Sequence, residues 1–365
     1  MRIAINCRSI LLSQRTGIGR YTYHLLDNLG KIDPANAYVL HAPKRLFDFK
    51  RRLPDFSDHK NLKRYTDFFQ RGVGKCDVYH LPCPDVIGTY SGKLVVTIHD
   101  LIYKTFPQSH MPQTIELTEK YMQGIAARAD KIICISENTR RDLHAFLDIP
   151  VEKSCVVYNG VDHSMFYPLS PEERINAAGQ LKEMGIGRPY ILYVGTIEPR
   201  KNLTGLLESF ALLKSRRMFD GQLVVAGMKG WMVDNVGGLI KELGIQADVI
   251  FTGFVRDDQL CQLYNMAEVF VFPSFYEGFG FPILEAFCCG AAVITAQTSS
   301  CGEIAGEAAI SVDPGDCKEM ANAMEQVLTD KTFKESLRKA GLKRARDFSF
   351  EKMAQGTLEV YRSLL

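Results

Sequence analysis

The sequence predicts an α/β protein built from two Rossmann-like domains. Short apolar runs alternate with longer amphipathic segments, a pattern typical of parallel sheets covered by helices. A break at residues 162–173, where two prolines stand close together, divides this alternation into two sets. The chain of 365 residues is also longer than one hydrophobic core usually serves.

The first set of elements precedes this break. Apolar runs predict strands, and the amphipathic stretches between them predict helices. The expected strands are Ile3–Asn6, Tyr38–His41, Val78–Leu81, Leu94–Ile98, Lys131–Ile135 and Cys155–Tyr158. The expected helices include Tyr21–Leu29, Thr114–Ala129 and Glu137–Phe146.

The second set follows the break and has the same alternation. Its expected strands are Tyr190–Val194, Gln222–Ala226, Val249–Thr252, Val269–Phe272 and Ala292–Thr295. Its expected helices are Leu203–Lys214, Val236–Leu243, Asp258–Met266, Pro282–Cys289, Cys317–Leu328, Thr332–Asp347 and Phe350–Leu365.

These two sets define the expected domains. We expect an N-terminal domain over residues 1–165, a C-terminal domain over residues 166–347, and a last helix in residues 348–365 that packs back toward the N-terminal domain. Ligands of open α/β sheets bind outside the carboxyl ends of the strands. A cleft between the two domains is therefore expected.

Composition argues against several classes of protein. A formal net charge of +2 does not favour nucleic acid as a partner. The ten cysteines include no Cys-x-x-Cys pair, and several lie in apolar runs, which fits reduced thiols in a cytoplasmic protein. No signal peptide and no apolar stretch of about 18 residues is found, so we expect no membrane span.

The stretch Phe275–Ala286 carries two carboxylates around a helix start. Glu277 leaves the carboxyl end of a buried strand, and Glu285 lies early in the helix that Pro282 is expected to open. Backbone N–H groups at a helix N-terminus suit a phosphate, and carboxylates accept hydrogen bonds from hydroxyl groups. The pattern indicates a ligand that carries both phosphates and hydroxyls.

A second polar segment, Gly195–Asn202, follows another expected strand. Arg200 supplies a planar fork of donors and Lys201 a point charge, which together suit a diphosphate, while Asn202 can cap the next helix. The alternative is a solvated basic turn. Placement directly after a strand favours the binding site.

In the first half, glycines and a histidine follow expected strands. Gly17 and Gly19 would let a helix N-terminus approach a phosphate, although the third glycine of a dinucleotide fingerprint is missing, which disfavours an NAD site. His99 ends a strand, where it can contact a sugar or manage a proton; the alternative is a loop histidine bonded to the backbone.

Three further segments have a structural and a functional interpretation. Ser136 is expected to cap a helix. Gly253-Phe254-Val255 ends a strand where backbone groups could hold a nucleobase. The basic and apolar stretch Lys44–Leu53 is either a solvated face or a peripheral contact with an anionic membrane.

Together these motifs resemble the family 4 glycosyltransferases with the GT-B fold, especially bacterial mannosyltransferase-like members that build surface polysaccharides. The resemblance covers nearly the whole chain. It rests on Gly17–Gly19, His99-Asp100, Ser136-Glu137, Asn159-Gly160-Val161, Gly195–Asn202, Gly253-Phe254-Val255 and the E-x7-E element from Glu277 to Glu285.

The resemblance implies roles for these residues. Arg200 and Lys201 would hold the nucleotide diphosphate and stabilise it as it leaves. Glu277 would bind hydroxyls of the transferred sugar, and His99 would contact that sugar near its reacting carbon. The implied donor-binding residues are Gly17, Gly19, Gly195, Val255, Phe279, Gly280, Phe281 and Glu285, the last through the ribose hydroxyls.

The resemblance also implies a retaining, metal-independent glycosyltransferase without a cofactor. The implied reaction moves mannose from GDP-mannose to a saccharide or lipid-linked acceptor, with the C-terminal domain binding the nucleotide sugar and the N-terminal domain the acceptor. A UDP- or dTDP-sugar as donor, a nucleotide-sugar epimerase of the same fold, and a binding protein without catalysis are the alternatives. The enzyme would act in the cytoplasm, with a peripheral membrane contact as a hypothesis.

Overall fold

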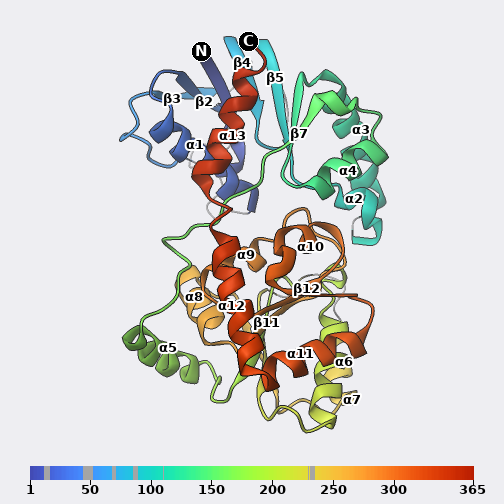
Figure 1. The fold of residues 1–365 in the computed structure, drawn as a ribbon. Coiled ribbons are helices and arrows are strands. Elements are labelled where there is room, and N and C mark those ends of the chain that lie inside the picture. The colour runs from blue at the N-terminus through green and yellow to red at the C-terminus, as the bar shows by residue number, and fades with distance from the viewer. Residues whose placement is uncertain are drawn as a thin grey trace. The chain divides into compact units, whose positions relative to one another are not determined.

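The computed structural model describes residues 1–11, 17–43, 52–67, 71–84, 89–109, 111–228, 230 and 235–365. Most of the basic stretch, Lys44–Arg51, therefore lies outside the described residues. The chain forms two compact units, one of Met1–Gly160 with Ser349–Leu365 and one of Val161–Phe348 (Figure 1).

The first unit is a seven-stranded parallel sheet in the order β3-β2-β1-β4-β5-β6-β7. Its strands are β1 (Arg2–Asn6), β2 (Ala37–Pro43), β3 (Leu62–Asp67), β4 (Gly72–Leu81), β5 (Thr89–Ile98), β6 (Lys131–Cys134) and β7 (Ser154–Val156). Its helices are α1 (Gly17–Ile32), α2 (Ile102–Thr105), α3 (Pro112–Arg128), α4 (Glu137–Phe146) and α13 (Phe350–Arg362).

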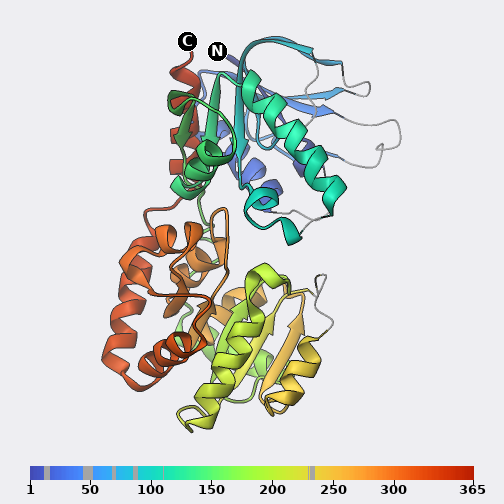
Figure 2. The same ribbon diagram turned by 90° about the vertical axis from the view of Figure 1, so that its right-hand side faces the viewer.

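Alternate residues of these strands face two different helical layers. Ile3 and Ile5 of β1 pack with residues of α1 and α13, whereas Ala4 packs with residues of α3. In Figure 1, α13 lies along α1, and the view of Figure 2 shows α3 on the opposite face of the sheet. Continuous apolar strands such as these form when both faces of a parallel sheet are covered.

The second unit is a six-stranded parallel sheet in the order β10-β9-β8-β11-β12-β13. Its strands are β8 (Tyr190–Val194), β9 (Gln222–Ala226), β10 (Val249–Gly253), β11 (Val269–Phe272), β12 (Val293–Ala296) and β13 (Ile310–Val312). Its helices are α5 (Pro171–Glu183), α6 (Leu203–Ser215), α7 (Val236–Glu242), α8 (Asp257–Met266), α9 (Phe281–Cys288), α10 (Ser299–Ala305), α11 (Cys317–Thr329) and α12 (Lys331–Ala345).

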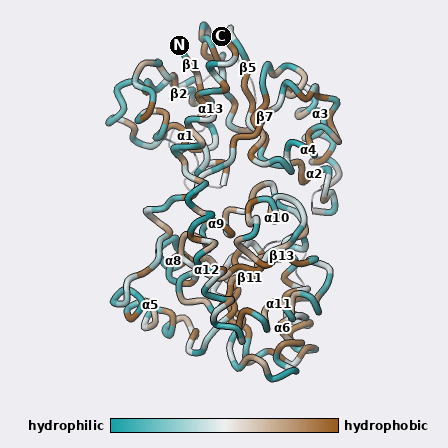
Figure 3. Tube along the Cα trace, in the orientation of Figure 1, coloured by the Kyte–Doolittle hydropathy of each residue, from teal (hydrophilic) through white to brown (hydrophobic). Residues whose placement is uncertain are grey.

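The core of this second unit lies between the sheet and the helices on its faces. Tyr193 of β8 and Val271 of β11 pack with Phe210 of α6 and Met324 of α11, and all four side chains are fully buried. Figure 3 shows apolar residues concentrated along the strands of each unit. The order of the strands reverses between β8 and β11, so the chain segments that leave these two strands run in opposite directions along the sheet. Open α/β sheets bind ligands at such a switch point.

The predicted α/β class with two Rossmann-like domains is confirmed. The sequence-based expectation lacks five strands and α-helices that the described residues form: β3, α2, α5, α10 and β13. Strand β3 has four exposed residues in its middle and no apolar run, because it lies at the edge of the sheet. Strand β13 is only three residues long.

The predicted break at residues 162–173 is wrong in position. The chain passes between the units after Gly160, and it returns after Phe348. Phe166 is buried in the second unit, with its ring edge-on to that of Tyr264 at 6.1 Å. Pro171 starts α5 because Ser170 caps this helix through a complete capping box, so the proline stands where a helix tolerates it.

Candidate active site

The loop that follows β8 is held close to the loop that follows β9. The N–H of Gly195 donates to the carbonyl of Ala226 at 2.9 Å, and the N–H of Ile197 donates to the carbonyl of Met228 at 3.0 Å. Gly227 has φ +150°, and a Cβ there would lie 2.0 Å from the carbonyl oxygen of Gly195. Only glycine permits this approach of the two backbones.

The same loop ends in a 3₁₀ turn, Pro199–Lys201, that carries the two predicted cations. Asn202 follows in the left-handed conformation, with φ 55°, and caps α6 by accepting a hydrogen bond from the N–H of Gly205 at 3.2 Å. The Nδ2 of Asn202 donates to the carbonyl of Pro314 at 2.6 Å. These contacts fix the backbone behind Arg200 and Lys201, and they confirm the predicted cap.

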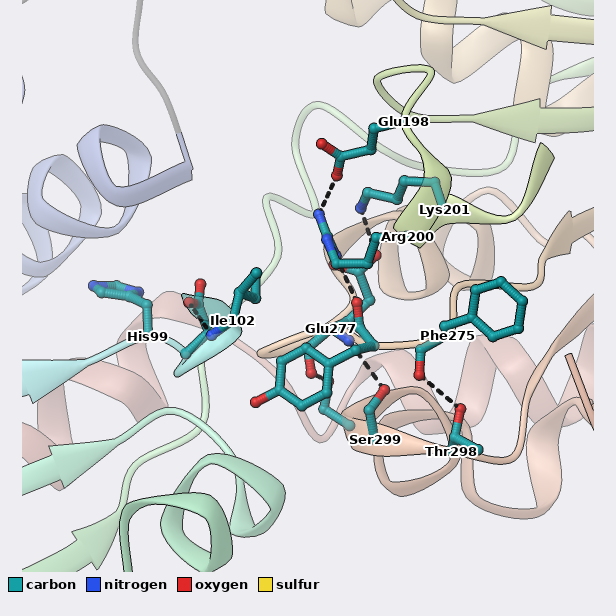
Figure 4. A network of polar contacts seen from close by, with 12 residues as sticks. His99, Ile102, Glu198, Arg200, Lys201, Phe275, Glu277, Thr298 and Ser299 are labelled. Carbon is teal, nitrogen blue, oxygen red and sulfur yellow. Dashed lines mark hydrogen bonds and ion pairs between the residues drawn. The ribbon is translucent and has the colours of Figure 1, made fainter. Parts of the chain in front are cut away.

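Arg200, Lys201 and Glu277 meet in one ion-pair cluster (Figure 4). Glu277 lies 3.0 Å from Nη1 of Arg200 through Oε2 and 2.5 Å from Nζ of Lys201 through Oε1. Glu198 forms a second ion pair with Arg200. The cluster therefore contains two cations and two carboxylates, and its side chains are all largely buried.

Hydrogen bonds to backbone carbonyl groups join the loops after β8 and β11 around this cluster. Arg200 donates from Nη1 to the carbonyl of Tyr276 at 2.5 Å, and the N–H of Phe275 donates to the carbonyl of Arg200 at 2.9 Å. Because β8 and β11 are adjacent strands, both loops leave the sheet at its switch point. The parallel sheet thus brings residues 76 positions apart into direct contact.

Burial by itself would raise the pKa of the Glu277 carboxyl. The charges of Lys201 and Arg200, together with the hydrogen bond from Lys201, outweigh this effect and hold the pKa below its ordinary value of 4.5. Glu277 is therefore an ionised acceptor at neutral pH. Such a carboxylate can bind sugar hydroxyls but cannot serve as a proton donor.

Glu285, the second carboxylate, lies on α9. It is 8% exposed, and its Oε2 accepts a hydrogen bond from the hydroxyl of Tyr264 on α8 at 3.0 Å. Helix α9 begins at Phe281, after Gly280 in the left-handed region at φ 107°. Phe279 is buried, and its ring stands edge-on to that of Phe281 at 5.1 Å.

The last predicted donor-binding residue of the second unit, Val255, lies between β10 and α8 and is partly exposed. It follows Gly253, which has φ +69°, and Phe254, whose side chain is 70% exposed. The carbonyl of Gly253 accepts a hydrogen bond from the N–H of Gly227 at 2.9 Å. The ends of β9 and β10 are therefore adjacent at this edge of the sheet.

The other predicted residues belong to the first unit. Gly17 is exposed and Gly19 is buried in the first turn of α1. His99 follows β5 and donates from Nε2 to the carbonyl of Pro82 at 2.7 Å, and its ring stands edge-on to Tyr21 at 4.9 Å. Burial lowers the pKa of His99, so the imidazole is neutral at neutral pH with its proton on Nε2.

Sequence reasoning missed several residues that complete the cluster. Glu198 pairs with Arg200, and hydroxyl groups of Thr298, Ser299 and Ser300 contact the backbone of the loop after β11. Glu198 carried a usable signal, because it follows β8 two residues before Arg200. The hydroxyl residues carried none in their types alone, since serine and threonine are common in loops.

No group of three or more His, Cys, Asp or Glu side chains among the described residues is placed to hold a metal ion. No helix in the described part of the chain is long and apolar enough to cross a bilayer.

Two family models match the chain. The model described as "Glycosyltransferase Family 4" matches residues 16–165, and the one described as "Glycosyl transferases group 1" matches residues 181–344. The O-antigen chain mannosyltransferase B of Escherichia coli is 30% identical, with 96% of each chain covered. The serotype-specific mannosyltransferase WbdA of Escherichia coli is 31% identical over 75% of this chain and 34% of its own length.

Solved structures share the fold at low identity. A sucrose-phosphate synthase of Thermosynechococcus elongatus superposes with a TM-score of 0.76 and 21% identity, over 100% of this chain and 98% of that one. The HepE protein of Anabaena, solved with UDP and glucose, superposes with a TM-score of 0.72 and 16% identity over the full length of both chains.

Proposed function

Because the chain belongs to glycosyltransferase family 4, we propose that it transfers mannose from GDP-mannose to a saccharide or lipid-linked acceptor. The product would be part of a cell-surface polysaccharide such as an O-antigen. The names of the two Escherichia coli relatives support mannose and this kind of product. Retention of the anomeric configuration is part of the proposal.

The observation that carries the proposal is the cluster of Arg200, Lys201 and Glu277 at the switch point of the second sheet. Glycosyl transfer develops negative charge on the departing diphosphate and positive charge on the sugar. Fixed cations are thus more useful in the transition state than in the ground state. A carboxylate beside them suits sugar hydroxyls.

In the proposed reaction, the bond between the sugar's anomeric carbon and the diphosphate oxygen breaks. A bond from that carbon to the acceptor hydroxyl forms on the same face, and the acceptor proton passes to the leaving phosphate. Lys201 and Arg200 stabilise the diphosphate, Glu277 orients the sugar, and Glu285 binds the ribose. His99, Gly17 and Gly19 keep their predicted roles toward the sugar and the diphosphate.

We further propose that no metal ion takes part, since Arg200 and Lys201 can supply the positive charge that a divalent cation provides elsewhere. We also propose that the protein acts in the cytoplasm and that it makes a peripheral contact with the membrane. Co-sedimentation with anionic liposomes tests that contact, and Lys/Arg→Ala changes in residues 44–53 that leave co-sedimentation intact would contradict it.

A thermal-shift panel tests the donor. GDP and GDP-mannose at about 100 times Kd should each stabilise the protein by about 2.7 kcal/mol, with or without EDTA. Shifts with UDP or dTDP compounds alone would contradict GDP-mannose as the donor. Interconversion of a nucleotide sugar without any acceptor would indicate an epimerase instead, and a shift that requires a divalent cation would contradict metal independence.

A further inference from the structure

The start of α10 and the residue before it, Thr298, contact the backbone on both sides of Glu277. Ser299 Oγ accepts a hydrogen bond from the N–H of Glu277 at 3.0 Å, and Ser300 Oγ donates to the carbonyl of Glu277 at 2.8 Å (Figure 4 draws the first). Thr298 Oγ1 donates to the carbonyl of Phe275 at 3.1 Å. We refer to Thr298, Ser299 and Ser300 as the hydroxyl brace.

Ser299 adopts a backbone conformation that serine rarely takes. Its φ is 55°, in the left-handed region, where a side chain other than glycine is strained. Among the described non-glycine residues, only Asn202, Arg217 and Ser299 have a positive φ. Asn202 follows Lys201 in the sequence, and Ser299 is hydrogen-bonded to the backbone of Glu277. Two of these three strained residues therefore support the ion-pair cluster.

Strain of this kind persists where the surrounding structure overrides it, and it is concentrated at functional sites. Glycine would satisfy the backbone at position 299 without strain. It could not accept the hydrogen bond from Glu277, however. Serine at this position therefore provides an oxygen atom for the backbone of Glu277 at the expense of backbone strain.

We propose that Ser299, supported by Thr298 and Ser300, is a positioning residue that orients Glu277 toward the hydroxyls of the donor sugar. This inference rests on the proposed function. The two hydrogen bonds fix both peptide groups of Glu277, while the ion pairs with Arg200 and Lys201 fix its carboxylate. The brace acts on the sugar through Glu277 and does not touch the nucleotide-binding Glu285.

The test compares the binding of GDP with that of GDP-mannose by calorimetry. In Ser299→Gly and Ser299→Ala, the affinity for GDP should stay within about twofold of the wild-type value, while the affinity for GDP-mannose falls about tenfold, the usual loss for a hydrogen bond to a charged group. The rate at which GDP is released from GDP-mannose in water should fall between about 10- and 100-fold, because misplacing an orienting group is that costly.

The two variants separate positioning from stability. Ser299→Gly relieves the backbone strain, so it should unfold at a temperature no lower than Ser299→Ala, yet both should lose the same binding of the sugar. Ser336→Ala, which removes an exposed serine hydroxyl that donates to the carbonyl of Phe333 at 2.7 Å, is the control and should change neither ligand's affinity. Glu285→Gln should weaken GDP and GDP-mannose equally.

Wild-type affinity for GDP-mannose in Ser299→Gly would overturn the inference, and so would an equal loss of affinity for GDP and GDP-mannose. If the wild-type protein binds only UDP or dTDP compounds, the same comparison is made with that nucleotide and its sugar. A wild-type protein that binds no nucleotide sugar would overturn the proposed function, and the inference with it.

Discussion

At the scale of single residues, Glu277 illustrates how a buried charge is maintained. Two cations, Arg200 and Lys201, contact its carboxylate where water has little access. A buried ion pair seldom adds much net stability, but leaving one of its members unpaired typically costs about 3–5 kcal/mol. We therefore expect the cluster to be sensitive to loss of either sign of charge.

Lys201→Met should both destabilise the protein and impair catalysis. Arg200 remains beside Glu277, so we expect the free energy of unfolding to fall by about 1–3 kcal/mol, less than for a fully unpaired charge. Loss of phosphate stabilisation should lower kcat/KM by about 100-fold. Denaturant unfolding and steady-state kinetics with the donor measure the two effects.

Lys31→Met is the matched control. Lys31 is an exposed lysine that forms an ion pair with Asp27 at 2.6 Å, and its side chain is 58% exposed. Its loss should change the free energy of unfolding by less than about 0.5 kcal/mol, since exposed ion pairs contribute little. Equal effects of the two substitutions would contradict the burial argument.

Glu277 should also contribute to the pH dependence of stability. Its pKa is lower in the folded protein than its ordinary value of 4.5, so its stabilising contribution is present above pH 4.5 and is lost as the pH falls through the folded pKa. The substitution Glu277→Gln should therefore lower the free energy of unfolding more at neutral pH than at acid pH. Denaturant unfolding of both proteins at several pH values measures this, and a difference that does not shrink toward acid pH would contradict it.

At the scale of elements, the passage of the chain between the two units depends on close backbone packing. Gly160 ends the first unit's main segment, and Ser349 begins the segment that leads into α13. A Cβ on Gly160 would lie 2.1 Å from the backbone nitrogen of Phe350. Asn-Gly pairs favour turns in general, whereas the requirement for glycine at position 160 comes from a segment nearly two hundred residues later.

Gly160→Ala should destabilise the first unit by about 1–3 kcal/mol, because the backbone of Phe350 cannot move aside easily. Gly179→Ala is the control. Gly179 lies within α5, where a Cβ meets nothing within 4 Å, and the substitution should stabilise this helix by about 0.5–1 kcal/mol. Thermal unfolding of both variants tests the pair, and a stabilised Gly160→Ala would contradict the packing.

At the scale of the whole molecule, the last helix of the chain completes the core of the first unit. Met353, Ala354, Leu358 and Tyr361 of α13 are buried in that core. The hydroxyl of Tyr361 also forms a hydrogen bond of 2.6 Å with Nδ1 of His80 on β4. Burial, together with the smaller effect of His99, lowers the pKa of His80 to about 3, so the imidazole is neutral at neutral pH.

Removal of residues 349–365 should therefore affect the two units differently. We expect the amides of β1 and β4 to lose protection from hydrogen exchange, because the apolar face under α13 becomes exposed to water. The amides of β8 and β11 should keep their protection, since their core contains no residue of α13. Equal loss of protection in both units would contradict this division.

Much of the fold was predictable because its signals are local. Tyr190–Val194 and Val269–Phe272 match their predicted bounds, since buried parallel strands are short continuous apolar runs. Edge strand β3 has no such run, so its sequence resembles a loop. Ser170 and Pro171 fall within the predicted break at residues 162–173, although a capping box makes them the start of a helix.

The sequence by itself determined which polar residues follow the strands, including Arg200, Lys201, Glu277 and Glu285. The tertiary structure decided how they are paired: Glu277 with the two cations, Glu198 with Arg200, and Glu285 with Tyr264. The physical reason is the parallel sheet. It places β8 beside β11 and β11 beside β12, so that loops distant in sequence leave one edge of the sheet together.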